Sequence, residues 1–349
     1  MKKLKIVVVG PGLIGKQHIR LIKENKECEL ASIVAPDHAI NHEIARLNET
    51  KIYHSISECI DRENIDGVII SSPNQFHYEQ GRICIDAGIP ALIEKPITSF
   101  IEDGIALAEL AEHNNAKILI GHHRAHSPLM AQARRVIKSG QLGRLVSVIG
   151  SAQFYKPSHY FLDGPWRKEI GGGPILINLI HEIGNMRALC GEIAAVQAIS
   201  SSAIRKFPVE DTVAINFIFE SGALGTFILS DTAASARSWE QTSRENPSYP
   251  SYPDEDCYNV AGTRGSLAIP TMRIKHYAPE VDPSWWTPFS EEILDVTRSD
   301  PLSCQLQHFL EIIRGKVEPI VSARDGLRNL QVTEAVRNSA LQKKMIQIN

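Results

Sequence analysis

The first third of the chain alternates short apolar runs with stretches of helical periodicity. The runs are rich in β-branched residues, apolar nearly throughout, and cover 5–10, 29–35, 66–72, 90–96 and 116–122. Such runs are typical of strands covered on both faces, and apolar residues at helical spacing occur in the segments between them. Strand, helix and strand in repetition predict a parallel sheet with right-handed crossovers, which is the Rossmann-type α/β architecture.

After about residue 122 the pattern changes to longer strands, several with alternating apolar and polar positions. They cover 144–154, 194–203, 211–220, 222–231, 257–262 and 265–270. Alternation is typical of an antiparallel sheet with one open face, and the clearest hairpin turns at Ser221 and Gly222. We therefore predict an α/β domain over 1–122 and, over 123–349, an α+β domain with an open, mainly antiparallel sheet.

The rest of the second region holds two predicted helices and one long loop. Residues 303–315 and 326–344 have helical periodicity, and we expect both helices to pack back against the first domain. Residues 237–256 are rich in Ser, Pro, Tyr and charged side chains. A solvated loop is the first interpretation of this stretch, and a loop that covers a ligand or a neighbouring subunit is the alternative.

The composition is that of an ordinary soluble chain. The 349 residues are 43% hydrophobic with a formal net charge of -3, and the basic residues are dispersed, so no nucleic-acid partner is expected. No segment approaches the ~20 apolar residues of a membrane span, and the N-terminal run lacks a signal-peptide cleavage site. The six cysteines form no C-x-x-C pair, which suits a reducing compartment. We expect a cytoplasmic protein without a membrane partner.

The first motif with a chemical meaning is GPGLIG at 10–15, which directly follows a predicted strand and opens a helix. At this position the spacing G-x-G-x-x-G is the dinucleotide-binding fingerprint. The glycines permit a tight turn and let a pyrophosphate approach the helix N-terminus, where free N–H groups and the helix dipole favour negative charge. The motif predicts a dinucleotide cofactor contacted by Gly10, Gly12, Leu13, Ile14 and Gly15.

The identity of the cofactor depends on the end of the second predicted strand. A site selective for NAD usually has an acidic residue there, about 20 residues after the glycines. This chain has Ala35 at that position and Asp37 two residues later, and the nearest basic candidates are His38 and the more distant Arg46. We expect NAD(H), with Asp37 at the ribose, and NADP(H) stays open as the alternative.

A polar pair interrupts the apolar stretch GGGPILINLIHEIG at 171–184. Asn178 and His181 are three residues apart, which on a helix places both side chains on one face. Burial of such groups without hydrogen bonds costs roughly 1–3 kcal/mol each, so both need partners. A histidine on an apolar face is by itself more often a hydrogen-bonded core residue, so the pair alone does not decide between core and site.

The triplet Glu94-Lys95-Pro96 ends the fourth apolar run. The carboxyl ends of parallel strands form the edge where open α/β sheets bind ligands, and Pro96 restricts the backbone of Lys95. Elsewhere a lysine is usually a solvated charge, but beside a bound cofactor Lys95 is a candidate catalytic residue. Glu94 and Lys95 are both candidate cofactor contacts. Glu94 either orients this lysine or satisfies neighbouring backbone groups.

Four motifs in this order resemble the glucose-fructose oxidoreductase / inositol dehydrogenase / MocA (Gfo/Idh/MocA) family. They are GPGLIG, SSPNQFH at 71–77, the Glu94-Lys95-Pro96 triplet and GGGPILINLIHEIG, and the resemblance covers essentially the whole chain. It implies an N-terminal NAD(P) domain and a C-terminal domain for substrate binding and oligomerisation. It further implies chemistry at a sugar or polyol carbon without a metal, and pairing of the open sheets into homodimers or homotetramers.

The resemblance also implies roles for the candidate residues. His181 stands at the histidine of the family's GGG…H motif, where an imidazole, with an unperturbed pKa of about 6.5, can take the proton of a carbinol hydroxyl. Lys95 holds the substrate oxygen and stabilises developing negative charge. The family commonly has Asp four residues before the histidine, where this chain has Ile177. Asn178, the next residue, can bind a substrate hydroxyl or orient the imidazole but carries no charge.

Two further groups of residues are weaker candidates. The loop after the third predicted strand corresponds to the family loop that contacts the nicotinamide and its ribose, although a plain Pro-Asn turn is the alternative. Its candidate cofactor contacts are Ser71, Pro73, Asn74 and His77.

Four residues are candidates for the rim of a substrate pocket. His123 and Arg124 lie at the predicted domain junction, and the histidines around them fit no zinc motif. Trp166 and Arg167 either bind a sugar, through an apolar face and a bidentate donor, or pack at the surface.

These features together predict an NAD(P)-dependent oxidoreductase acting on CH–OH groups of a sugar, cyclic polyol or sugar derivative. An NADPH-dependent sugar or ketone reductase is one alternative. A dinucleotide-binding regulatory protein without turnover is the other, and the presence of both Lys95 and His181 argues against it.

Overall fold

The computed structural model describes residues 2–348 and forms two compact units. The first comprises Met1–His126 and Pro301–Leu330, and the second Ser127–Asp300 and Gln331–Asn349. The division falls within helix α11 (Ala323–Gln342), so its first turns belong to one unit and its later turns to the other. Within residues 2–348, no helix combines the length and the hydropathy that a membrane crossing needs.

A six-stranded parallel sheet forms the centre of the first unit, with the strand order β3-β2-β1-β4-β5-β6. This order is typical of Rossmann-type folds, which bind ligands at the carboxyl ends of the strands where the order reverses, here between β1 and β4. Five strands coincide with the five predicted runs, whereas β3 has only three residues and was not predicted because so short a strand shows no periodicity. The strands are β1 (Leu4–Val9), β2 (Cys28–Val34), β3 (Lys51–Tyr53), β4 (Gly67–Ile70), β5 (Ala91–Glu94) and β6 (Ile118–Gly121).

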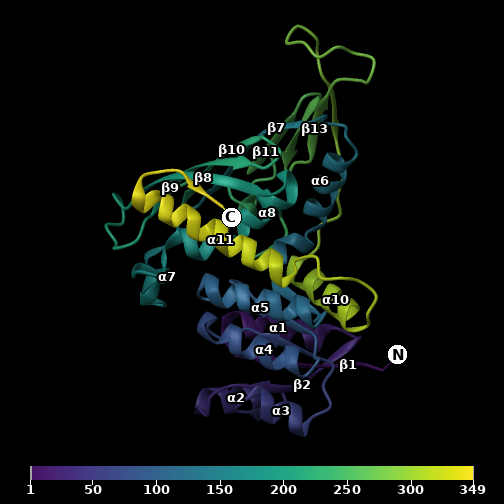
Figure 1. Cartoon of the computed structure of the whole chain (residues 1–349), viewed down its shortest axis with the longest axis vertical. Helices are drawn as coiled ribbons and strands as arrows, with labels where there is room; N and C mark the ends of the chain where they lie inside the picture. Colours follow the sequence, from purple (N-terminus) through teal and green to yellow (C-terminus); the bar gives the residue numbers. More distant parts are fainter. Residues whose placement is uncertain (1, 349) are drawn as a thin grey trace. The chain divides into compact units, whose positions relative to one another are not determined.

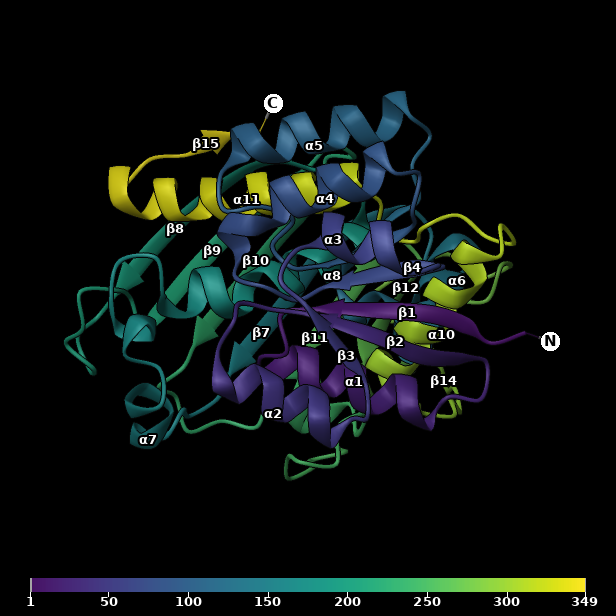
Figure 2. The same ribbon diagram turned by 90° about the horizontal axis from the view of Figure 1, so that it is seen from below.

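Helices cover both faces of this sheet, as Figure 1 and Figure 2 show. Ile6 and Val8 of β1 belong to one buried cluster, and Val7 and Val9 belong to another on the opposite face. Because every one of these positions is apolar and buried, the predicted strands covered on both faces are confirmed. The first face carries α1 (Leu13–Glu24), α2 (Ala39–Leu47) and α10 (Pro301–Ile313), and the second carries α3 (Ile56–Arg62), α4 (His77–Asp86) and α5 (Ile101–His113).

The second unit contains a nine-stranded sheet in the order β14-β13-β12-β11-β7-β10-β9-β8-β15. Strands β7 and β10 run parallel and the remaining pairs run antiparallel, and the predicted hairpin between β9 and β10 is confirmed. The six predicted strands correspond to β7 to β12, and three further strands extend the two edges. The strands are β7 (Leu145–Gln153), β8 (Ile193–Ser201), β9 (Thr212–Phe219), β10 (Leu224–Ser230), β11 (Tyr258–Gly262), β12 (Gly265–Ile269), β13 (Arg273–His276), β14 (Ser290–Ile293) and β15 (Ile346–Gln347).

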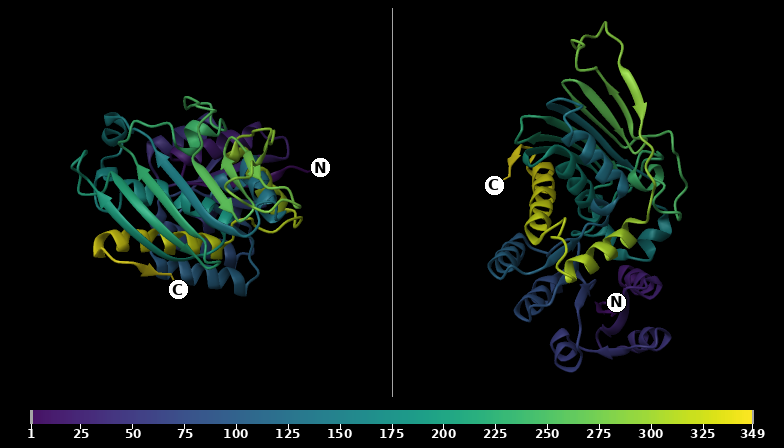
Figure 3. Two further views of the ribbon diagram at one scale, coloured as in Figure 1. Left: turned by 90° about the horizontal axis from the view of Figure 1, so that it is seen from above. Right: turned by 90° about the vertical axis from the view of Figure 1, so that its right-hand side faces the viewer.

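One face of this sheet is covered by helices and the other is open (Figure 3, left). Apolar residues of α6 (Pro128–Lys138), α8 (Ile180–Cys190) and the later turns of α11 join the inward positions of the strands in one buried cluster. Along β9, buried residues such as Val213 and Ile215 alternate with the exposed Ala214 and Asn216. The predicted open, mainly antiparallel sheet is therefore confirmed.

The segment 237–256 differs from the predicted solvated loop in its first part. It includes the short helix α9 (Trp239–Thr242), and Trp239 is buried with its indole N–H donating to Glu245 over 3.0 Å. Ser127 donates a second hydrogen bond of 2.5 Å to the same carboxylate. Residues 246–254 are exposed, so the interpretation as a solvated loop holds only for that part.

Candidate active site

The glycine loop between β1 and α1 has the shape that a dinucleotide pyrophosphate requires. Gly10 has φ +79°, and a Cβ there would lie 2.7 Å from backbone atoms of Ser72. A Cβ on Gly12 would meet no atom within 4 Å, so the space in front of this residue is open. Gly12 caps α1 without a side-chain hydrogen bond, which leaves the N–H groups of the first turn for an anion. Leu13, the first residue of α1, is 81% exposed beside this opening. These residues fit the predicted cofactor.

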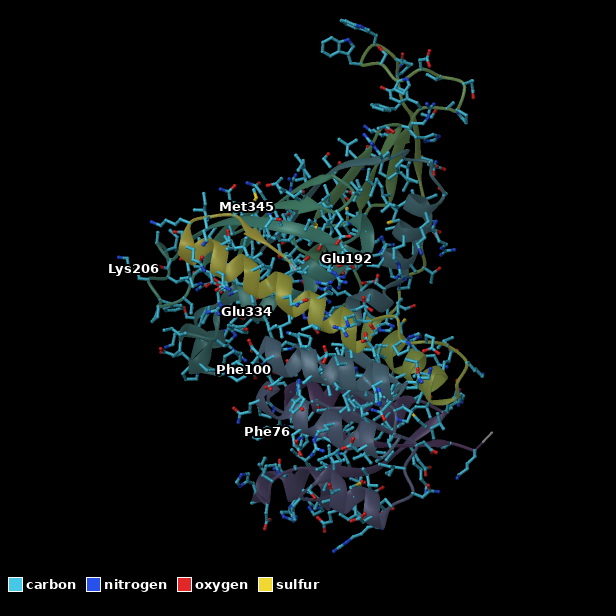
Figure 4. All side chains as sticks on the ribbon, in the orientation of Figure 1. Phe76, Phe100, Glu192, Lys206, Glu334 and Met345 are labelled. Carbon is cyan, nitrogen blue, oxygen red and sulfur yellow. The ribbon has the colours of Figure 1, made fainter. Side chains whose placement is uncertain are left out.

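The loop after β4 divides into a buried anchor and an exposed part. Ser71 donates hydrogen bonds to the carbonyl oxygens of Val9 (2.8 Å) and Gly10 (2.9 Å), so it fixes the glycine loop. Pro73 and Asn74 are exposed at the carboxyl end of β4, where a ligand can reach them. Phe76, labelled in Figure 4, is likewise 46% exposed.

His77, the last of the predicted cofactor contacts in this loop, is not exposed to a ligand. It is fully buried, with Nδ1 2.9 Å from the carbonyl oxygen of Pro96 and Nε2 2.9 Å from that of Ser72. Burial lowers the pKa of this imidazole below its ordinary value, although the two carbonyls oppose the shift. The geometry favours a role in tying the loop after β4 to the residues after β5.

Lys95 follows β5 and is half-buried in a cluster of charged groups. Burial lowers the pKa of its ammonium, Glu94 opposes this shift, and the charge of Arg124 adds to it. Its peptide bond to Pro96 is cis. An ammonium that is partly removed from water donates stronger hydrogen bonds to a developing oxyanion than a solvated one does.

Glu94 is buried beside Lys95 and bonds to α1. Its Oε1 lies 2.9 Å from Nε2 of His18, which is also buried, and its Oε2 accepts from the backbone N–H of Lys95 over 3.3 Å. Burial alone raises the pKa of Glu94, but the hydrogen bond and charge of His18, with the charges of His123 and Lys95, hold it below its ordinary value. The sequence left open whether Glu94 orients Lys95 or satisfies neighbouring backbone groups, and the bond to the backbone N–H of Lys95 is of the second kind.

The glycine triplet that precedes α8 is explained by close approaches within the second unit. Gly171 and Gly173 have φ values of +97° and +80°, and a Cβ on Gly173 would lie 2.6 Å from Glu210. That carboxylate accepts the backbone N–H of Ile175 over 2.9 Å, and burial raises its pKa. The triplet thus fixes the start of the helical segment.

This segment begins with a π-helical turn, η4 (Ile175–Leu179), before α8 continues it. Such turns occur frequently at functional sites because they change the register of the side chains. Asn178 lies within the turn and is half-buried, and His181 lies in the first turn of α8 and is 9% exposed. The helical spacing considered for Asn178 and His181 thus spans the change from a π-helical turn to an α-helix.

A buried network fixes α8 directly after His181. Tyr258 of β11 donates a hydrogen bond to Glu182, and Asn185 donates one of 3.2 Å to the hydroxyl of Tyr258. All three side chains are buried. The helix that carries His181 is thus held against the sheet by polar as well as apolar contacts.

Lys156, which the sequence did not single out, contacts Asn178, one of the predicted site residues. Its side chain is 11% exposed, and its ammonium donates a hydrogen bond of 2.7 Å to Oδ1 of Asn178. The ammonium also lies 4.7 Å from the ring centroid of Tyr160 and 3.8 Å from Asp231. Asp231 in turn pairs with Arg205 over 2.6 Å. The only sequence signal was a lysine between aromatic residues in FYKPSHY, which is too weak to identify a site.

Trp166 and Arg167 lie on the turn η3 (Pro165–Lys168), near α7 (Ser158–Leu162). Trp166 is 56% exposed. Arg167 donates a hydrogen bond of 2.5 Å to the carbonyl oxygen of Tyr160, and its guanidinium lies 4.0 Å from the centroid of that ring. In the first unit, His123 and Arg124 lie on η2 (His123–His126), with Arg124 buried and His123 half-buried.

Two family models match the chain. The model of the oxidoreductase family with an NAD-binding Rossmann fold (GFO_IDH_MocA) matches residues 4–122, and the model of the GFO/IDH/MocA C-terminal domain matches residues 130–268. The chain belongs to the Gfo/Idh/MocA family. It is an NAD(P)-binding oxidoreductase of the dehydrogenase and reductase class, which confirms the predicted enzyme class and cofactor type.

Relatives in this family extend over nearly the whole chain. The rhizopine catabolism protein MocA of Rhizobium meliloti is 25% identical over 344 residues, which cover 96% of this chain and 94% of that protein. The scyllo-inositol 2-dehydrogenase (NAD(+)) of Bacillus subtilis is 25% identical and covers 97% and 94%. The WlbA dehydrogenase of Bordetella pertussis, solved with NADH and UDP-GlcNAcA, has a TM-score of 0.77 at 19% identity over 100% and 99% of the two chains, a likeness of fold.

Proposed function

We propose that this protein oxidises or reduces a CH–OH carbon of a sugar, cyclic polyol or sugar derivative with NAD(P), using Lys95 and His181. The observation that carries the proposal is the position of Lys95 at the carboxyl end of β5, half-buried, with its pKa lowered by burial and by Arg124. The inositol dehydrogenase among its relatives supports a polyol as the class of substrate.

The cofactor contacts are the open glycine loop and the exposed part of the loop after β4. Gly10, Gly12 and Gly15 shape the space for the pyrophosphate, Leu13 and Ile14 border it, and Pro73 and Asn74 contact the nicotinamide half. Bound NAD(P) supplies the acceptor or donor of the hydride at the reacting carbon. Asp37 is the proposed partner of the adenosine ribose.

Lys95 is the proposed stabiliser of the substrate oxygen. As the carbinol is oxidised its hydroxyl loses a proton, and negative charge develops on the oxygen before the carbonyl forms. An ammonium that burial has already destabilised gains most from this charge, because the charge–charge interaction is stronger where water is excluded. Glu94 is the proposed electrostatic partner of Lys95, since its charge opposes the lowering of the pKa of that ammonium.

His181 is the proposed general base, and general acid in the reverse direction. A neutral imidazole takes the hydroxyl proton at physiological pH. Asn178 takes a binding role beside it. Because Lys156 donates to Oδ1 of Asn178, the amide nitrogen is the end that is left to donate to a substrate hydroxyl. Trp166, Arg167, His123 and Arg124 are the proposed rim of the substrate pocket.

We also propose that the open face of the nine-stranded sheet pairs two copies of the chain, as a homodimer or within a homotetramer. Paired outward positions form rows across the strands, among them Asn259, Ile149, Thr226, Asn216 and Gln197. A second row comprises Ile228, Ala214 and Ile199. None of these side chains carries a charge, which is typical of the centre of a homodimer interface rather than of free surface.

A substrate screen tests the proposed reaction. Polyols and aldoses at high enzyme concentration, followed by nicotinamide absorbance, should reveal at least one oxidised class, and Lys95→Met and His181→Ala should each abolish that turnover while NADH still binds. Tight NADH binding without turnover of any substrate would instead favour the regulatory alternative.

A further inference from the structure

The segment between β13 and β14 is an exposed hairpin, residues 277–289, which we name the aromatic arm. It extends beyond the end of the nine-stranded sheet (Figure 1 and Figure 3, right). Trp285 is 88% exposed and Trp286 is 83% exposed, although tryptophan is on average a highly buried residue. Two adjacent aromatic side chains left in water are typical of a surface on which another molecule binds.

The aromatic arm has a defined conformation. Arg264, in the turn between β11 and β12, donates hydrogen bonds to the carbonyl oxygens of Ala278 and Val281 over 2.6 and 2.9 Å. At the other side of the hairpin, the hydroxyl of Tyr277 donates to the carbonyl oxygen of Ser284 over 2.7 Å. Because the arm is ordered before it binds, little conformational entropy is lost when its tryptophans are covered.

The charge of the aromatic arm is negative. Glu280 and Asp282 are exposed, and residues 277–289 include no lysine or arginine. Within residues 2–348, neither carboxylate forms an ion pair. A surface that covers the arm should therefore combine apolar side chains with positive charge.

The opposite edge of the same sheet has this combination, since β14 and β15 are its two outermost strands. Between α11 and β15, Lys343 and Lys344 are exposed, and neither ammonium has an ion-pair partner in the described part of the chain. Leu341 is 69% exposed, and Met345, labelled in Figure 4, is 45% exposed. We name residues 341–345 the basic edge.

The aromatic arm is too short to reach the basic edge of its own copy. Nine strands at the usual spacing place the two edges about 38 Å apart, whereas a hairpin of this length reaches about 20 Å. A twofold axis that runs along the strands and pairs two open faces brings β14 of each copy to β15 of the other. Both contacts then form together, as a closed symmetric interface requires.

We propose that the aromatic arm of one copy binds the basic edge of a second copy when the open faces pair. This inference rests on the proposed pairing of open faces. Each tryptophan buries about 150–250 Å², so the four tryptophans of two arms account for about 600–1,000 Å². A stable interface buries about 1,600 Å² in total, and the arms therefore supply a large share of it.

Dilution of the whole protein tests the role of the tryptophans. Sedimentation gives the dissociation constant of the dimer, which W285S/W286S should raise at least about thirtyfold, because tryptophans dominate interface energies. Phe100→Ser, which removes an aromatic side chain that is 66% exposed in the first unit, is the matched control and should leave the constant unchanged. The tryptophan emission of the wild type should shift to longer wavelength on dilution, and W285F/W286F should lack most of this shift.

Charge reversal tests the basic edge. K343E/K344E should weaken the dimer about tenfold or more, because the carboxylates of the arm then face like charges. Addition of E280K/D282K to the same chain should restore the dissociation constant to within about threefold of the wild type. An edge that had only lost stability would not be restored by substitutions in the arm.

A wild-type dissociation constant in W285S/W286S, or a charge reversal that is not restored, would overturn the inference. If Thr226→Arg still dissociates the dimer in that case, the pairing of open faces stands without the arm. A wild type that is monomeric at every concentration would overturn both, whereas the proposed reaction is judged separately by turnover. An emission shift that follows added polyol instead of dilution would assign the arm to a carbohydrate and would also contradict the inference.

Discussion

The ammonium of Lys156 donates a hydrogen bond of 2.7 Å to the side-chain carbonyl of Asn178. This bond determines which end of the amide faces a substrate, because an asparagine that accepts at its oxygen is left with its N–H₂ group as a donor. It also places a positive charge beside Asn178, the residue that follows Ile177.

Lys156→Met should therefore impair turnover of the substrate without affecting the cofactor. Loss of a hydrogen bond to a charged group costs about 1.5–3 kcal/mol, so kcat/KM should fall about tenfold or more. The dissociation constant for NADH should stay the same. Lys168→Met is the matched control, since that ammonium lies 6.0 Å from the ring centroid of Phe207 and is not bonded to Asn178. An equal loss of activity in both variants would argue against a specific role of Lys156.

The alkaline limb of the pH profile should report the ionisation of Lys95. Its folded pKa lies below the ordinary value of 10.5, first because of burial, so activity that needs the ammonium should fall as the pH rises through this lowered pKa. Glu94 opposes the shift. Glu94→Gln should thus move the alkaline limb of kcat to lower pH. An alkaline limb that does not move in Glu94→Gln would contradict an effect of Glu94 on the ionisation of Lys95.

Glu94 should also link stability to pH. Its folded pKa lies below the ordinary value of 4.5, so the carboxylate stabilises the fold above that value and loses this contribution as the pH falls through the folded pKa. His18→Phe removes the hydrogen-bonding partner of a buried carboxylate and should lower the free energy of unfolding at pH 7 by about 3 kcal/mol. Urea denaturation measures both effects. The double variant H18F/E94Q should recover part of the loss, because no buried charge is then left without its partner.

The glycine loop and the position of Lys95 at a strand end could be predicted from the sequence because each signal is local. Gly10, Gly12 and Gly15 occupy one loop, and Lys95 follows a strand whose direction the alternating pattern already determines. The burial of His77 could not be predicted, since its two carbonyl partners come from the backbone of Ser72 and Pro96. Sequence spacing alone does not distinguish a histidine that faces a ligand from one that faces the core.

The second unit was harder to predict because its contacts join distant segments. Lys156 and Asn178 are 22 residues apart, and Asp231 lies in a third segment of the chain. Trp239 and Glu245 stand in a stretch of polar composition, yet they bond to each other in the interior. Polar composition indicated a loop, whereas buried hydrogen bonds between its own residues explain why this part folds inward.

A charge on the open face of the nine-stranded sheet should prevent the proposed pairing of copies. Thr226 lies in the middle of an uncharged row, between Ile149 and Asn216. Thr226→Arg places like charges opposite each other in a symmetric interface, where burying an unpaired charge is strongly unfavourable. Sedimentation should show a smaller species for this variant than for His113→Arg, which adds the same charge at an exposed position of α5. A wild type that sediments as a monomer would contradict the proposal.

Alanine substitutions at two glycines of the nucleotide loop should affect stability and cofactor binding differently. Gly10 has φ +79° and lies against the backbone of Ser72, so Gly10→Ala should destabilise the protein by at least about 1–2 kcal/mol. Gly12 has an ordinary φ of -74° and no atom within 4 Å of a Cβ, so Gly12→Ala should leave the free energy of unfolding nearly unchanged.

The methyl group added by Gly12→Ala nevertheless occupies the space in front of the N-terminus of α1, where a pyrophosphate needs close approach to the N–H groups. Gly12→Ala should therefore weaken NADH about tenfold or more in fluorescence titrations, since about 1.4 kcal/mol corresponds to a factor of ten. Wild-type NADH affinity in this variant would mean that the cofactor's phosphates lie elsewhere.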